Sequence, residues 1–315
     1  MSNWLEKPNI LSALILFGVV LVAGGYGVIT YTQRPEMESF NLDDDYVFEF
    51  NFDRPQAVKL PKDLKEISGM TAWKNPNEVI TVQDEDGELF IVNTNSGKVT
   101  KSFKFSKDRD YEGIARNGDS IYVLETDGDI HTFVFNDAQD EFESEKLETA
   151  FSYRNDTEGI CFDPVTGHLL IVPKEQELNP TEADQNRRGI YSYDLRARSL
   201  SPQPTYYIDQ IEVGDAVYGK TARYNMKPSG IAVDPVTKDI YVVSSVGNIM
   251  VVIDRESHLK HIELLEKGTF RQPEGITFSD SGDLYISSEG RGGDGIIASF
   301  PRQNKSNDQE DNSRE

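Results

Sequence analysis

The chain contains a single cysteine, Cys161, among its 315 residues, so it cannot form an intrachain disulfide. Cys161 lies in an apolar run, where a small buried hydrophobic residue is the usual role and a catalytic thiol is the alternative. The four histidines are scattered, and the sequence has no HExxH motif or Cys/His cluster that would indicate zinc. It also has no nucleophile elbow, phosphate-binding loop or Ser/His/Asp order.

Basic residues are scarce as well. Lys and Arg number 32 against 54 Asp and Glu, which gives a formal net charge of −22. A surface of this sign repels the phosphates of nucleic acids and anionic lipid headgroups, so we expect no nucleic-acid partner. It suits solubility, cations or basic partners.

Long hydrophobic runs are absent except for one uncharged stretch of 22 residues, 10–31. At about 1.5 Å per residue it spans roughly 33 Å, enough to cross a hydrocarbon core of about 30 Å. We expect an uncleaved, single-pass transmembrane helix. A signal peptide is the alternative, but the run exceeds a signal core and no A-x-A site follows it. Lys7 precedes the run and acidic residues follow it, which favours an extracytoplasmic domain, periplasmic or at the cell surface.

Residues 1–9 are then a short N-terminal segment and 32–45 an acidic linker. At the other end, residues 303–315 form a polar tail without an apolar residue, which we expect to be disordered.

A degenerate repeat organises the remaining chain. Each copy has Glu or Ser, then Gly, then Ile or Met, and leads into strand-like runs. The repeated glycines are Gly69, Gly113, Gly159, Gly230 and Gly275, at spacings of 44, 46, 71 and 45 residues. A period near 45 with four strands per unit is typical of a β-propeller blade.

The sequence therefore predicts an all-β fold, a monomeric five-bladed β-propeller over residues 46–302. The units contain nineteen strand-like runs, and residues 46–52 alternate apolar and polar side chains as a twentieth. We expect this N-terminal strand to complete the blade that contains Gly275 and to close the ring. The long third interval holds two irregular stretches, 175–189 and 212–227, which either cover a channel mouth or are plain surface insertions.

The residue before each repeated glycine indicates a site. If each unit begins with its innermost strand, these residues surround the central channel: Ser68, Glu112, Glu158, Ser229 and Glu274. Three converging carboxylates cannot all stay ionised and unpaired, so a proton, a basic side chain or a hard cation must compensate them. Calcium accepts six to eight oxygen ligands with loose geometry, and we predict that Glu112, Glu158 and Glu274 bind Ca²⁺. Alternatively, each glutamate accepts backbone N–H groups and holds the ring together.

Further candidates lie at the channel mouth. Period-two geometry puts Asp110 and Asp156 on the same strand face as the glutamates. The ends of the second strands supply Asp84, Glu125 beside Thr126, Lys174, Ser245 and Glu289. Lys174, a base among acids, is either a substrate contact or a plain counter-charge.

The five repeat heads together (ISGMTAW, YEGIA, TEGICFDPVTG, PSGIAVDPVTK and PEGITFSDSGDLYI) resemble the SdiA-regulated (YjiK-like) proteins. The resemblance covers about residues 58–300. It implies an exported bacterial β-propeller related in shape to phytase-like and NHL-type propellers, with a cation site in the channel. It carries no established activity.

We expect a membrane-anchored binding propeller that engages an unidentified ligand or protein at the channel mouth. The alternative is a calcium-dependent phytase-like or esterase-like hydrolase, which would need Lys and Arg side chains converging on the site. A scaffold without a small-molecule site is a third possibility.

Overall fold

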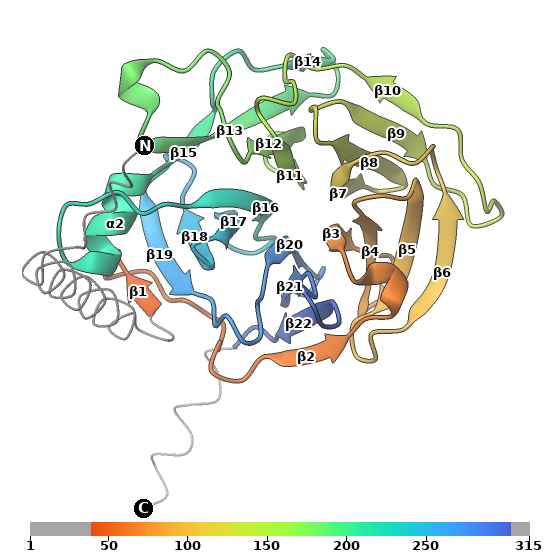
Figure 1. Ribbon diagram of the computed structural model, residues 1–315, viewed down its shortest axis with the longest axis horizontal. Helices are drawn as coiled ribbons and strands as arrows, with labels where there is room; N and C mark the ends of the chain where they lie inside the picture. The colour runs from red at the N-terminus through yellow and green to blue at the C-terminus, as the bar shows by residue number, and fades with distance from the viewer. Residues whose placement is uncertain (1–38, 304–315) are drawn as a thin grey trace, which may run out of the picture. The chain divides into compact units, whose positions relative to one another are not determined.

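The computed structural model describes residues 39–303, which form a five-bladed β-propeller, as predicted. Figure 1, viewed along the propeller axis, shows five sheets around a centre formed by β3, β7, β11, β16 and β20. Blade one contains β3 (Ile67–Ala72), β4 (Glu78–Gln83), β5 (Glu88–Asn93) and β6 (Val99–Lys104). Blade two contains β7 (Tyr111–Asn117), β8 (Ser120–Glu125), β9 (Ile130–Val134) and β10 (Glu145–Leu147).

The third and fourth blades have extra strands. Blade three contains β11 (Thr157–Asp163), β12 (His168–Pro173), β13 (Arg187–Asp194), β14 (Ser199–Leu200) and β15 (Tyr206–Asp209). Blade four contains β16 (Lys227–Val233), β17 (Ile240–Val246), β18 (Ile249–Ile253) and β19 (Leu259–Leu264), with β1 (Ser39–Asn41) outermost. Blade five contains β20 (Pro273–Phe278), β21 (Leu284–Ser288), β22 (Ile296–Phe300) and β2 (Gln56–Lys59).

The predicted closing strand, residues 46–52, is not a strand. The outer strand of blade five is β2, which pairs with β22 in register Val58 to Ile297. Residues 46–52 instead run extended between blades four and five, where Phe50 packs edge-on against Tyr241 and Phe52 stacks on Phe300 at 4.0 Å. Their apolar alternation reflects burial of every second side chain in this groove, and not pairing as a strand of a sheet.

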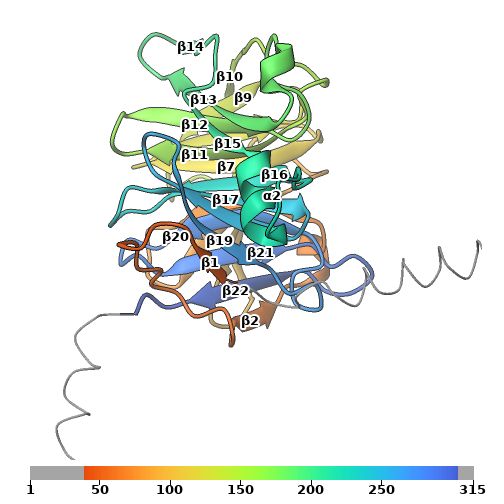
Figure 2. The ribbon, with the colours of Figure 1, turned by 90° about the vertical axis from the view of Figure 1, so that its left-hand side faces the viewer.

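We call residues 39–59 the N-terminal strap, because they join two blades. Its first strand, β1, pairs with β19 of blade four, and its last, β2, pairs with β22 of blade five. Figure 2 shows its orange trace passing along the outer side of these blades.

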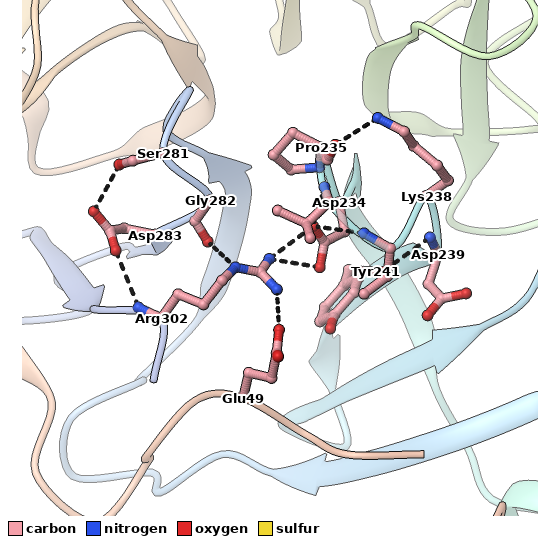
Figure 3. Close-up of polar contacts among 12 residues, drawn as sticks. Glu49, Asp234, Pro235, Lys238, Asp239, Tyr241, Ser281, Gly282, Asp283 and Arg302 are labelled. Atoms are coloured by element: carbon pink, nitrogen blue, oxygen red, sulfur yellow. Dashed lines mark hydrogen bonds and ion pairs between the residues drawn. The ribbon is translucent and has the colours of Figure 1, made fainter. Parts of the chain in front are cut away.

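Buried ion pairs also link neighbouring blades. The turn after the first strand of blade four begins at Asp234, whose carboxylate is fully buried and receives Arg302 Nη2 at 2.7 Å on both oxygens. Figure 3 shows Arg302 between Asp234, Glu49 of the strap and the carbonyl oxygen of Gly282. Blade three repeats the arrangement, since Asp163 in its equivalent turn pairs with Arg255 of blade four at 2.5 Å.

Helical structure is sparse within residues 39–303. Two 3₁₀ turns, η1 (Lys62–Leu64) and η2 (Glu182–Asp184), accompany α2 (Gln210–Tyr218), which Asp209 caps by accepting the Ile211 N–H at 2.7 Å. This helix includes part of the irregular stretch 212–227 and contacts β13, β15 and β19. It lies at the periphery of the propeller, away from the axis (Figure 1). No helix in the described part is long and apolar enough to cross a membrane. The predicted transmembrane helix at 10–31 and the tail from 304 lie outside the described residues.

Candidate ligand site at the channel mouth

The repeated glycines set the width of the channel. A Cβ atom added to Gly69 would lie 2.6 Å from Gly113 Cα, and one added to Gly230 would lie 2.3 Å from the Glu274 carbonyl oxygen. Side chains therefore cannot replace these hydrogens, and the inner strands approach as closely as glycine allows. The axial cavity that remains is about 10 Å³, room for one water molecule.

The five residues before these glycines, which we call the heads, each have a counterpart at or just beyond the end of the second strand of the same blade, which we call the rim residue. The strands pair in the same register in every blade, for example Tyr111 to Glu125, Thr157 to Pro173 and Pro273 to Ser288. A β-bulge interrupts the register at each head, so the head has no direct partner in the ladder, but the head and the rim residue each come one residue after a paired position in every blade. The head and rim residues of the five blades are Ser68 and Asp84, Glu112 and Thr126, Glu158 and Lys174, Ser229 and Ser245, and Glu274 and Glu289.

In blade three the pair is an ion pair. The Lys174 ammonium contacts the buried Glu158 carboxylate at Oε1. Burial opposes the charge on Lys174, but Glu158 and Glu274 outweigh it and raise the Lys174 pKa. Burial, followed by the charge of Glu274, raises the pKa of Glu158 to about 8, while Lys174 works in the opposite direction. Lys174 is thus a counter-charge inside the carboxylate ring.

In blade two the pair is a neutral hydrogen bond. Thr126 Oγ1 donates to Glu112 Oε1 at 3.0 Å. Burial raises the pKa of Glu112 to about 9, and the nearby charges of Glu158 and Asp110 add to this effect. Both Glu112 and Glu158 therefore have a donor within their own blade.

Glu274 in blade five has no hydrogen-bond donor of this kind. Its side chain is 4% exposed, and neither carboxylate oxygen has a hydrogen-bond partner among residues 39–303. Burial raises its pKa to about 8; Lys174 and the Gln272 side chain lower it, and Glu289 raises it. The Gln272 side chain lowers this pKa as a hydrogen-bonding neighbour does, but its contact with Glu274 falls outside hydrogen-bond geometry, and Gln272 Oε1 is itself without a partner in the described chain.

The neighbouring rim residues are also acids. Burial, with Glu66 and Glu85, raises the pKa of Asp84 to about 6, and Asp84 Oδ1 is buried without a partner among the described residues. Glu289 is half-buried, and its pKa is raised by burial and then by Asp84. We call Glu66, Asp84, Glu274 and Glu289 the acidic sector; it belongs to blades five and one.

The other predicted mouth residues have different surroundings. Ser229 Oγ donates to the Pro273 carbonyl at 2.7 Å and ties blade four to blade five, and the Ser68 carbonyl accepts Ser287 Oγ at 3.3 Å. Ser245 and Asp156 are half-buried, and Asp110 is exposed. Burial raises the pKa of Asp156, and Lys174 counteracts it.

Glu125 was expected at the channel mouth, and this was wrong. Because Thr126 faces Glu112, the preceding residue points to the opposite side of the strand. Glu125 is buried within blade two, where it contacts His131 Nε2 and lies 3.5 Å from Lys146 Nζ. His131 Nδ1 lies 2.9 Å from Ser144 Oγ. No local motif indicated this network, since its members come from three different segments.

The glutamates do not form a ready calcium site. Within residues 39–303 no group of three or more His, Cys, Asp or Glu side chains is arranged to hold a metal ion. Glu158 is occupied by Lys174 and Glu112 by Thr126, so the three predicted ligands are not jointly free. Calcium binding stays a prediction that this arrangement does not favour. Cys161 packs at the core of blades three and four, and burial raises its thiol pKa, which opposes thiol catalysis.

Comparison with known proteins gives a family and a fold. The family profile described as SdiA-regulated matches residues 48–291. Among solved structures, the glutaminyl cyclase of Myxococcus xanthus aligns with a TM-score of 0.53 and 11% identity, over 81% of this chain and 96% of that one. The PQQ-bound aldose sugar dehydrogenase of Streptomyces coelicolor aligns with a TM-score of 0.53 and 11% identity, over 85% and 99%. At these identities the likeness shows the propeller fold alone. No relative was found among curated proteins.

Proposed function

Since this chain belongs to the SdiA-regulated family, we propose that it is a membrane-anchored, extracytoplasmic binding propeller without catalytic activity. Its ligand enters the channel mouth and contacts the heads and rim of the blades. The anchor is the apolar stretch 10–31.

One observation carries this proposal: the Glu274 carboxylate is buried and both of its oxygens lack a partner in the described chain. Leaving a buried polar group unpaired costs about 1–3 kcal/mol, and more for a charged group. The other two head glutamates have donors from their own blades. A ligand that donates to Glu274 would remove this cost, so the position suits recognition.

The basic residues argue against an anionic substrate. A phosphate-handling hydrolase needs several cations aimed at one place. In this chain Lys174 pairs with Glu158, Lys227 with Glu175 and Arg187 with Glu177. Others donate to uncharged oxygens: Arg188 to the Met226 and Glu175 carbonyls, Arg223 to Gln210, and Arg271 to the Gly290 carbonyl. Because these basic side chains already have partners within the chain, the arrangement favours binding over phytase-like hydrolysis.

The test is ligand-induced stabilisation. Anything that binds the folded chain alone raises its melting temperature by mass action. Metabolites and metal ions are screened by thermal shift on the full-length protein in detergent, and each hit is repeated with Glu274→Gln and with the exposed control Glu148→Gln. Stabilisation lost in the first variant and kept in the second supports the proposal. A hit unchanged by Glu274→Gln places binding away from the channel mouth.

The anchor needs a separate measurement. Intact-mass analysis of protein from the membrane fraction should give the full-length chain, because no convincing cleavage site follows the apolar stretch. A product beginning after about Ala23 would refute the anchor. Protease protection in sealed cells then reports the side on which the propeller lies.

A further inference from the structure

We propose that the acidic sector binds the primary ammonium group of a small amine. This inference rests on the function proposed above and names the chemical class of its ligand.

The blades themselves show which chemistry is missing. In blade three the rim residue Lys174 brings an ammonium to the head carboxylate, and in blade two Thr126 brings a hydroxyl. In blade five the rim residue is Glu289, a second acid at the position of Lys174 in blade three, since the Glu289 and Lys174 N–H groups each donate to the carbonyl two residues before the head of their blade. The head of blade five therefore lacks the donor that its counterparts have, and a ligand ammonium would occupy the place that Lys174 takes in blade three.

The unpartnered atoms of this region are all acceptors. Asp84 Oδ1, Gln272 Oε1 and both oxygens of Glu274 are buried without partners among residues 39–303, and they come from blades one and five. An ammonium group has three donors and no acceptor, so it matches such a set. One member is an amide oxygen, and no trio of metal-ligating side chains is assembled in the described chain. Calcium, which takes six to eight oxygen ligands at 2.3–2.6 Å, fits this set less well.

Two basic groups face the sector, and neither neutralises it. Lys174 acts on Glu274 and Glu289, but its ammonium is held by Glu158 in the neighbouring ion pair. Arg291 lowers the pKa of Glu289, yet burial and the charge of Asp84 still leave that pKa raised. The buried acids of the sector thus resist ionisation in the absence of a cation, and a bound ammonium would compensate their charge and favour the ionised carboxylates.

The width of the channel limits the ligand. At the glycine ring the cavity is about 10 Å³, room for one water molecule, so a bulky ligand does not fit between the heads. A slender alkylammonium chain, similar to the lysine side chain already present, is the form of cation that needs least room beside the buried Glu274 carboxylate. A quaternary ammonium would be too wide and has no N–H group to donate.

Isothermal titration calorimetry on the full-length chain in detergent tests the inference with putrescine as the probe, at constant ionic strength. We expect saturable binding that weakens at least tenfold in Glu274→Gln and is unchanged in Glu148→Gln. Tetramethylammonium, which carries the same charge per nitrogen, should bind at least tenfold more weakly than putrescine. Glu289→Lys is the sharpest variant, because it recreates the head and rim pair of blade three; it should abolish putrescine binding and leave a folded chain with an unchanged or higher melting temperature.

The outcomes separate the two proposals. Binding of Ca²⁺ but not putrescine, lost in Glu274→Gln, overturns the amine assignment and leaves the binding function standing. Putrescine binding that survives Glu289→Lys, or that tetramethylammonium equals, also overturns the assignment. If neither putrescine nor any screened ligand binds in a manner that depends on Glu274, both proposals are wrong.

Discussion

Glu112, Glu158 and Glu274 occupy the same position in three blades, yet each meets a different residue across its own sheet. Thr126 donates a hydroxyl to Glu112 and Lys174 brings an ammonium to Glu158, whereas the rim residue of blade five is Glu289, a second acid whose charge raises the pKa of Glu274. A carboxylate at the same repeat position can thus be hydrogen-bonded, ion-paired or unpaired. The rim residue, more than the head, distinguishes the blades chemically.

Glu274 should influence how stability depends on pH. Burial raises its pKa from 4.5 to about 8, so between these values the folded chain holds a proton that the unfolded chain has lost. This contribution is fully present below about pH 4.5 and is lost as the pH rises through about 8, at up to ~1.4 kcal/mol per pH unit. Relative to wild type, Glu274→Gln should be less destabilised by raising the pH from 5 to 8.

Urea unfolding at pH 5, 6.5 and 8 measures this difference, with Glu148→Gln as the exposed control. A difference between wild type and Glu274→Gln that stays constant over this range would show that Glu274 is ionised in the folded chain throughout.

Gly230 should tolerate no side chain. Its φ is not in the left-handed region, but a Cβ atom would lie 2.3 Å from the Glu274 carbonyl oxygen, which belongs to a central strand and cannot move aside. Overpacking of this kind costs about 1–3 kcal/mol or more, so we expect Gly230→Ala to lose about 3 kcal/mol in chemical denaturation. Gly118, at φ 61° with open space around it, is the control: Gly118→Asn should cost less than ~1 kcal/mol. Equal losses would contradict a closely packed glycine ring.

At the scale of single elements, the sequence predicted the inner strands well, because each has near its start a glycine that close packing at the axis requires. The rim residues were predicted from the ends of the second strands; Glu125, one position before the rim residue Thr126, lies inside blade two instead. Residues 46–52 were predicted as a strand because an extended segment that buries alternate side chains produces the same pattern. The partner of Lys174 could not be chosen from sequence, since several acids converge on the axis.

The link between the Asp234 turn and Arg302 should be worth far more than a surface ion pair. Asp234 is fully buried, and removing the guanidinium leaves its charge with backbone donors only, such as the Val236 N–H at 2.8 Å. We expect Arg302→Ala to lower the free energy of unfolding by about 3 kcal/mol. Asp294→Asn, which breaks an ion pair with Lys59 that is 80% and 52% exposed, should cost under ~0.5 kcal/mol.

A double-mutant cycle of Arg302→Ala with Asp234→Asn would isolate the pair. A coupling energy below ~0.5 kcal/mol would mean that Arg302 acts through its packing on Phe50 instead.

At the scale of the whole molecule, the N-terminal strap determines whether the ring has a free edge. It supplies the outer strand of blade five through β2, an extra strand on blade four through β1, and between them Phe50 and Phe52 in the groove. Without it, β22 would present unpaired backbone groups and the groove would expose aromatic surface, a combination that promotes aggregation. The strap also connects the propeller to the apolar stretch at 10–31.

The final prediction concerns this closure. A chain of residues 39–303 should be monomeric and fold cooperatively, whereas a chain of residues 61–303 should aggregate or melt at a much lower temperature. A synthetic peptide of residues 39–60, added in excess, should restore the melting temperature, because it can pair with β19 and β22 and refill the groove. A peptide with Phe50→Ala and Phe52→Ala keeps both strands and is the matched control; it should restore stability less well. If the shorter chain melts like the longer one, closure does not depend on the strap, and the contacts between the inner strands alone hold the five blades together.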